Sequence, residues 1–145
     1  MPLVEESTFR IAMANIAGWG DTDVFPFPVE NHIMHDVPDL MLNVLCDVRD
    51  NFSDIFNAQP VWYQPALAPV GYTGFRWATQ IDPMWNAYLL SLVLTLAPAI
   101  ESERISRDEE CVYSYRYEPS ADGIFWTDGW KRFQERTRVL AVSVR

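Results

Sequence analysis

With 145 residues, the chain is long enough to bury one core, and we expect one domain rather than two. Its hydrophobic fraction of 49%, with 14% aromatic residues, excludes the polar composition of disordered chains. A net charge of −9 argues against the whole chain acting as a clamp on nucleic acid, because phosphate contacts need a basic surface.

The charge is unevenly distributed along the chain. Residues 1–100 contain three basic side chains against eleven acidic ones. Residues 129–145 reverse this ratio, with Glu135 as the one acid among five basic side chains: Lys131, Arg132, Arg136, Arg138 and Arg145. The tail is therefore locally basic.

Cysteine usage and the N-terminus predict a cytoplasmic protein. Cys46 and Cys111 lie far apart in apolar stretches, so we interpret both as small buried hydrophobes in a reducing compartment. The first residues lack a basic segment followed by an apolar run, so no secretory signal is expected. Residues 84–100 carry no charge, but they fall short of the roughly 20 apolar residues of a membrane span, which favours a core helix.

The first expected helix covers residues 5–17. Its apolar residues recur at helical spacing, and Gly18 follows where a left-handed cap is usual. The next segment, residues 18–28, combines glycines, aspartates and prolines with large apolar groups, so we expect a loop that packs on the protein or forms a contact surface. The large groups in this loop are Trp19, Val24, Phe25 and Phe27.

A second expected helix begins at residue 36, with Asp36 as its N-cap and Pro38 in its first turn. One face is apolar, formed by Val37, Leu40, Met41, Val44, Leu45, Val48, Phe52 and Ile55. Prolines and glycines then predict an irregular segment over residues 59–78. A third helix is expected from Asp82 and Pro83; it is apolar on nearly all sides, which places it in the centre of the core.

The last part of the chain predicts a hairpin and a helix. Residues 111–117 alternate in the manner of a strand, and a short partner is expected at 124–126. A terminal helix, capped near Asp128, follows; its apolar face holds Trp130, Phe133, Thr137 and Leu140. The expected fold is α+β and predominantly helical, with three to four helices and a small antiparallel hairpin. Residues 1–110 form the helical region and 111–145 the hairpin and terminal helix of a single domain or fragment.

Three polar groups have competing interpretations. His32 and His35 are spaced for a metal pair, but no third ligand is evident, and a surface turn explains them equally. Asp21 and Asp23 suit magnesium, yet aspartates beside glycine commonly stabilise turns, and we favour the turn. The charged residues 101–110 read as a solvated loop. We therefore predict no metal site, and no nucleophile or phosphate-loop motif is present.

One segment carries a resemblance to a known family: Trp19-Gly20-Asp21-Thr22-Asp23-Val24-Phe25-Pro26-Phe27-Pro28-Val29-Glu30-Asn31-His32. It resembles the leading region of bacterial RNA-directed DNA polymerases, the reverse transcriptases related to group II intron and retron enzymes, which include phage-defence members. Further similar strings bring the match to about residues 10–136. They are Gly71 to Arg76, Ala78 to Pro83, Asn86 to Tyr88, Tyr113 to Arg116 and Gly129 to Gln134.

The resemblance implies that residues 111–145 belong to the fingers of such an enzyme, following an N-terminal extension. The family's Asp-Ile-x-x-Phe-Tyr and Tyr-x-Asp-Asp strings, which hold Mg²⁺ in the intact polymerase, do not occur here. The segment from Thr137 to Arg145 departs from the family, so we expect a truncated or frameshifted frame, no polymerase activity of this chain alone, and no cofactor of its own.

The expected function is to help position the RNA or DNA template and primer, with the remainder of the polymerase as partner and without a membrane. The candidate nucleic-acid-binding residues are Arg116, Lys131 and Arg132, followed by Arg76. The alternative is a stand-alone interaction module that docks through Trp19, Phe25, Phe27 and Trp62. A metal-dependent nuclease built on Asp21, Asp23, His32 and His35 is a third, less favoured hypothesis.

Overall fold

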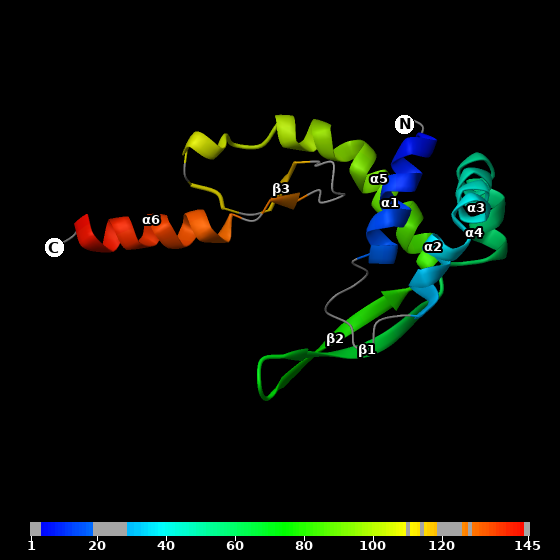
Figure 1. Ribbon diagram of the computed structural model, residues 1–145, viewed down its shortest axis with the longest axis horizontal. Coiled ribbons are helices and arrows are strands. Elements are labelled where there is room, and N and C mark those ends of the chain that lie inside the picture. The colour runs from blue at the N-terminus through cyan, green and yellow to red at the C-terminus, as the bar shows by residue number, and fades with distance from the viewer. Residues whose placement is uncertain are drawn as a thin grey trace. The chain divides into compact units, whose positions relative to one another are not determined.

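Helices and two small antiparallel sheets make up the part of the chain that the structure describes (Figure 1). The computed structural model describes residues 4–18, 29–109, 111–113, 115–118, 126–127 and 129–143. These residues confirm an α+β fold with a helical majority. The chain divides into two compact units, Met1–Thr95 and Leu96–Arg145, and the division falls within a long helix.

The first helix, α1 (Glu6–Gly18), lies close to its expected position. It buries the four apolar residues that carry the helical spacing, namely Phe9, Ala12, Met13 and Ile16. The predicted left-handed cap at Gly18 is wrong, since Gly18 is the last helical residue and the positive φ found among the described glycines is that of Gly71.

The expected second helix is divided into separate elements. After a 3-10 turn (Val29–His32), the structure has α2 (Ile33–Asp36), α3 (Pro38–Asp50) and α4 (Phe52–Ala58). Asp36 ends α2, so its prediction as N-cap is wrong; Val37 takes that position, and Pro38 is in the first turn as predicted. At the break between α3 and α4, the Asn51 side chain donates to Asp47 Oδ1 over 2.7 Å, a local bond that competes with helix continuation.

The buried face of α3 differs from the predicted one. Met41, Leu42, Leu45 and Val48 are buried, whereas Leu40 is 59% exposed. Both Leu40 and Leu42 fit a helical period, and the choice between them depends on where the neighbouring helices lie.

The long helix α5 (Pro83–Ser102) begins where the sequence predicts, and Asp82 Oδ1 accepts the N–H of Met84 over 3.0 Å. The prediction of burial on nearly all sides is wrong. Trp85, Tyr88 and Ser91 are buried, but another side of the helix is exposed at Leu89, Val93, Leu96 and Ile100. By length and composition alone α5 could cross a membrane, and 33% of its most apolar stretch is buried within the protein.

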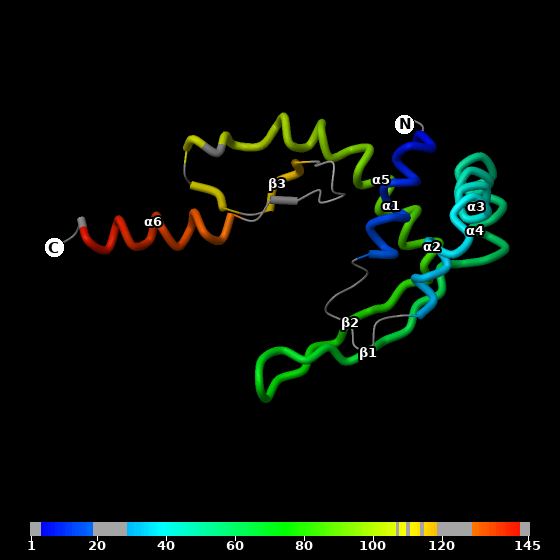
Figure 2. Tube along the Cα trace, viewed as in Figure 1, coloured from blue at the N-terminus to red at the C-terminus, as the bar shows by residue number. Residues whose placement is uncertain are grey.

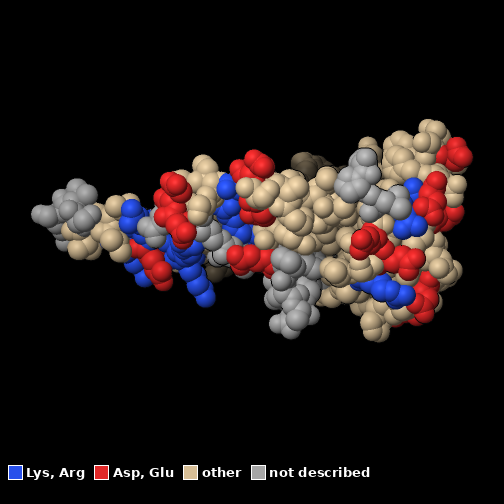
Figure 3. All heavy atoms as spheres, turned by 90° about the horizontal axis from the view of Figure 1, so that it is seen from above, with Lys and Arg blue, Asp and Glu red and all other residues tan. Residues whose placement is uncertain are grey.

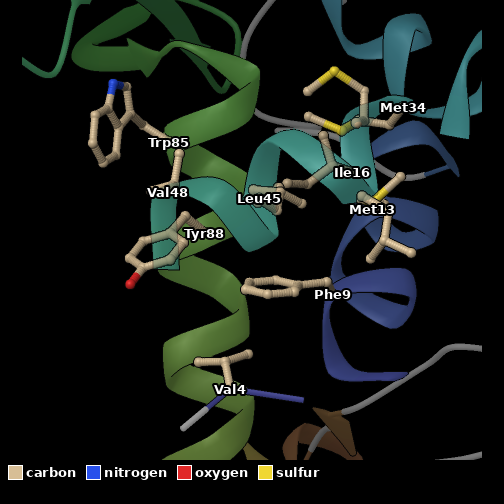
Figure 4. Packing of buried hydrophobic residues seen from close by; sticks show 12 residues of the cluster. Val4, Phe9, Met13, Ile16, Met34, Leu45, Val48, Trp85 and Tyr88 are labelled. Atoms are coloured by element: carbon tan, nitrogen blue, oxygen red, sulfur yellow. The ribbon is translucent and has the colours of Figure 1, made fainter. Parts of the chain in front are cut away.

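The core of the unit Met1–Thr95 joins α1, α3 and α5 (Figure 4). The Phe9 ring stacks on Tyr88 with centroids 6.1 Å apart, and Leu45 and Val48 approach from α3. Arg49 closes one side of this core, because its guanidinium lies 6.0 Å from the Phe9 ring and donates to the Val4 carbonyl over 3.0 Å. These contacts tie three helices into one packed cluster.

The segment predicted to be irregular forms a regular hairpin (Figure 2), so that prediction is wrong. Strand β1 (Tyr63–Val70) pairs antiparallel with β2 (Gly74–Ile81) around a turn in which Gly71 has φ 68°. The Asp82 N–H donates to the Trp62 carbonyl over 3.2 Å, so the even-numbered residues of β1 direct their backbone groups toward β2. Pro65 and Pro69 are at odd-numbered positions, where an N–H would point away from β2. Since β1 and β2 form a two-stranded sheet, such prolines remove no ladder hydrogen bond.

The second hairpin has the expected place but is short. Strand β3 (Arg116–Tyr117) pairs antiparallel with β4 (Trp126–Thr127), and helix α6 (Trp130–Ser143) follows. Cys111 precedes β3 and is exposed, and Cys46 is half-buried, so the interpretation of the cysteines as buried is wrong for Cys111. The predicted cap at Asp128 lies outside the described residues.

Candidate nucleic-acid interface

Helix α6 gathers positive charge on an exposed surface. It carries Lys131, Arg132, Arg136 and Arg138 with one acid, Glu135, and its side chains from Trp130 to Val142 are exposed. Figure 3 shows Lys and Arg side chains, with acidic side chains among them, over the part of the molecule that contains α6. Arg132 and Arg136 are one turn apart, and Lys131 and Arg138 are two turns apart, so each pair lies along one side of α6. This arrangement suits contacts to several phosphates.

An aromatic cluster fixes the start of α6. Phe133 stacks on Trp130 with centroids 5.4 Å apart and meets Tyr113 edge-on at 5.7 Å. Gly129 lies against the Tyr113 backbone so closely that a Cβ at Gly129 would overlap the Tyr113 carbonyl oxygen. The Phe133 N–H donates to the Gly129 carbonyl over 2.9 Å, which starts the helical ladder. The first turn of α6 is thus anchored on the segment before β3.

Gly129→Ala is expected to disrupt the packing of the first turn of α6 against the Tyr113 backbone. The added methyl group would meet backbone, which yields less readily than a side chain, so we expect a loss of about 1–3 kcal/mol in the local stability of α6. Amide hydrogen exchange at Phe133 measures the effect. Gly18→Ala is the control, since nothing lies within 4 Å of a Cβ there. Equal exchange at Phe133 in the Gly129→Ala protein and the unmodified chain would contradict the expected clash.

Arg116, which the sequence predicted to contact nucleic acid, is buried and bonded within the protein. Its residue is 7% exposed, and Nη1 donates to Glu101 Oε2 over 3.2 Å while Nη2 donates to the Ile105 carbonyl. The guanidinium therefore ties β3 to the end of α5 and the segment that follows it. Burial keeps Arg116 away from a phosphate backbone, so we leave it out of the candidate interface.

Glu101 is the centre of this network. Its Oε1 accepts from Arg104 Nη1 at 2.5 Å and from the Tyr117 N–H at 3.1 Å, and Arg104 also donates to the Tyr115 carbonyl over 2.7 Å. Burial by itself raises the pKa of Glu101, but the hydrogen bonds from Tyr117, Arg104 and Arg116 outweigh it and hold that pKa below its ordinary value. The interpretation of this region as a solvated loop is therefore wrong for Glu101 and Arg104.

The sequence contained one signal for this network. Glu101 and Arg104 have the three-residue spacing of a helical ion pair. The partner Arg116, fifteen residues further along the chain, had no such signal, because its approach depends on the turn after α5.

The other candidate residues lie in different places. Lys131 and Arg132 are exposed on α6, as a phosphate contact requires, whereas Arg76 is exposed on β2 in the unit Met1–Thr95. Trp62, from the alternative docking patch, is 64% exposed. The remaining residues of that patch, Trp19, Phe25 and Phe27, lie outside the described residues, as do Asp21 and Asp23.

The histidine pair is on the surface beside α2. The His35 ring Nδ1 lies 3.3 Å from Asp36 Oδ1, and both side chains are largely exposed. Across the residues that the structure describes, no three His, Cys, Asp or Glu side chains gather in a way that would hold a metal ion.

Comparison with known proteins found no match to any family model, curated protein or solved structure. The physical features of the two units are therefore the basis for a functional proposal.

Proposed function

We propose that this chain is the N-terminal part of an RNA-directed DNA polymerase and that α6 helps to hold the template and primer. The observation that carries the proposal is the concentration of exposed basic side chains on α6 in a chain whose net charge is −9. Such a distribution directs a polyanion to one helix, because the acidic remainder repels it. The resemblance of residues 10–136 to the leading region of these polymerases supports the same assignment.

In this proposal α6 binds and positions the template and primer, and the remainder of the polymerase carries out catalysis. Lys and Arg contacts to phosphates fix the register of a strand without reading its bases. Nucleotidyl transfer needs carboxylates that hold two Mg²⁺ ions, and the strings that supply them in the family do not occur in this sequence. Primer extension by the purified chain would overturn this division of roles.

Neutralising two basic residues of α6 tests the proposal. In the Lys131→Gln/Arg132→Gln protein, we expect affinity for a labelled duplex and a labelled single strand to fall by about 10-fold each at low salt. The slope of log affinity against log salt is expected to shrink by about 2, because each basic side chain that binds a phosphate adds roughly one unit to the slope. Fluorescence anisotropy across a salt series measures both quantities.

Two further variants on the same helix serve as controls. Gln134→Ala changes an exposed neutral residue and is expected to leave both quantities unchanged. Glu135→Gln removes the one acid of α6 and is expected to tighten binding. An unchanged salt slope in the double variant, with the helix content intact by circular dichroism, would rule out α6 as the phosphate contact.

A further inference from the structure

Helix α6 carries an exposed apolar side that contacts to phosphates do not use. Each residue of a helix is turned by about 100° from the one before it, so residues three, four and seven apart share a side. The residues that share this side of α6, which we call the apolar stripe, are Trp130, Phe133, Thr137 and Leu140. Trp130, Phe133 and Leu140 are 55%, 41% and 50% exposed.

Thr137 does not interrupt the apolar stripe. Its hydroxyl donates to the Phe133 carbonyl over 2.8 Å, which is a bond within α6. A hydroxyl that is satisfied by its own helix can enter an apolar environment without the full cost of an unpaired polar group. The stripe can therefore be removed from water along its whole length.

Positive charge borders the apolar stripe on both sides. By the same helical geometry, Arg132 and Arg136 follow one edge of the stripe, and Lys131 and Arg138 follow the other. Glu135, the one acid of α6, is on the side of the helix opposite to the stripe. The helix is thus apolar along one side and basic at both edges of that side, with its acid turned away.

A phosphate backbone accounts for the basic edges but not for the stripe. Bases can stack on Trp130 and Phe133, whereas Leu140 has neither a charge nor a ring. An anionic lipid surface matches both features, because its headgroups are negative and the layer beneath them is apolar. Such a surface is flat, so the long Lys and Arg side chains of both edges can extend to headgroups while the stripe is buried.

We propose that α6 lies in the surface of an anionic lipid membrane, with the apolar stripe at the acyl boundary and the basic edges on the headgroups. Trp130 suits this position, since indole rings are enriched at the interface between membrane and water. The expectation of no membrane partner concerned a spanning segment, and a helix that lies on a bilayer needs none. The proposal goes beyond the binding of template and primer and does not depend on it.

Sedimentation of the full chain with lipid vesicles tests the proposal. We expect binding to phosphatidylcholine vesicles that contain about 30% phosphatidylserine and none to phosphatidylcholine alone, because the headgroup charge attracts the basic edges. Leu140→Gln places an amide in the stripe and is expected to weaken binding by about 10-fold. Val139→Gln is the matched control, since Val139 is 60% exposed on the far side of α6, and it is expected to leave binding unchanged.

The basic edges are tested with the same vesicles. In the Lys131→Gln/Arg132→Gln protein we expect vesicle binding to weaken by about 25-fold, since each basic residue near an anionic surface contributes about 5-fold. This variant also weakens the binding of nucleic acid, so it does not separate the two partners. Leu140→Gln separates them, because it removes no charge and is expected to leave the affinity for a labelled duplex unchanged. A failure of the polymerase proposal appears in duplex binding, and a failure of the membrane proposal appears in vesicle binding.

The vesicle measurements can contradict the proposal in three ways. An absence of binding to the phosphatidylserine vesicles would overturn it and would favour an acidic groove on a protein as the partner of α6. Equal binding to phosphatidylcholine alone would overturn it as well, because an apolar segment such as α5 would then make the contact. The third contrary result is an equal effect of Leu140→Gln and Val139→Gln, with the helix content of both proteins intact by circular dichroism.

Discussion

Glu101→Ala is expected to destabilise the unit Leu96–Arg145 by about 3 kcal/mol. The substitution leaves the Arg116 guanidinium buried without its carboxylate partner, and breaking such a pair from one side typically costs about 3–5 kcal/mol. We expect the lower end because the Glu101 side chain keeps 19% exposure. Amide hydrogen exchange at Tyr117, whose N–H bonds to Glu101, should be about 100-fold faster.

Glu101 also makes the stability of the unit Leu96–Arg145 depend on pH. Because the pKa of Glu101 is lowered in the folded protein, its contribution is complete above the ordinary carboxyl pKa of about 4.3 and is lost as the pH falls through the lowered value. Exchange at Tyr117 should therefore rise relative to other amides on acidification, and Glu101→Gln should remove this component. Glu103→Gln, at an exposed position two residues away, is the matched control. If Glu101→Gln and Glu103→Gln both removed the pH dependence of exchange at Tyr117, the overall charge of the unit would set its stability and the pairing of Glu101 with Arg116 would not.

Leu45→Ala is expected to destabilise the unit Met1–Thr95 by about 3 kcal/mol or more. Leu45 is fully buried in the cluster formed by α1, α3 and α5, so truncation removes apolar packing and leaves a cavity (Figure 4). Leucine-to-alanine substitutions at buried sites cost about 2–5 kcal/mol. Urea unfolding followed by circular dichroism measures the loss as a lower midpoint.

Leu40→Ala provides a test of the helix orientation with the same chemical change. Leu40 is on the same helix but 59% exposed, so the expected effect is within about 0.5 kcal/mol. The pair of variants distinguishes the observed buried face of α3 from the one that the apolar pattern predicted. Equal destabilisation by both substitutions would contradict the observed orientation.

The sequence pattern correctly predicted the helices and strands whose positions depend on residues close together in the chain. The start of α5 followed from Asp82 and Pro83, because a side-chain cap and a first-turn proline act within a few residues. The four buried positions of α1 followed from helical spacing. The pairing of β3 with β4 followed from a turn signal between two short apolar stretches, although the strands are shorter than predicted.

The β1–β2 hairpin shows why local signals fail elsewhere. Prolines and glycines normally argue against regular structure, and residues 59–78 contain five of them. Both prolines of β1 fall on the side of the strand that makes no bonds to β2, a property that is visible once the register is known. That Phe75, Trp77 and Leu67 lie on one exposed face depends on the same register, which the local pattern does not reveal.

Composition, spacing and charge were enough to predict the helical majority, the acidic balance and the basic character of α6, because they are properties of residues that are near in the chain. Three features could be seen only in the folded chain: Arg116 is buried against Glu101, Leu42 is buried in place of Leu40, and Phe75 and Trp77 share an exposed face with Leu67. Each of these depends on contacts between residues that are distant in the chain or on strand register. A periodic pattern shows which faces an element has, and its neighbours in space select the one that is buried.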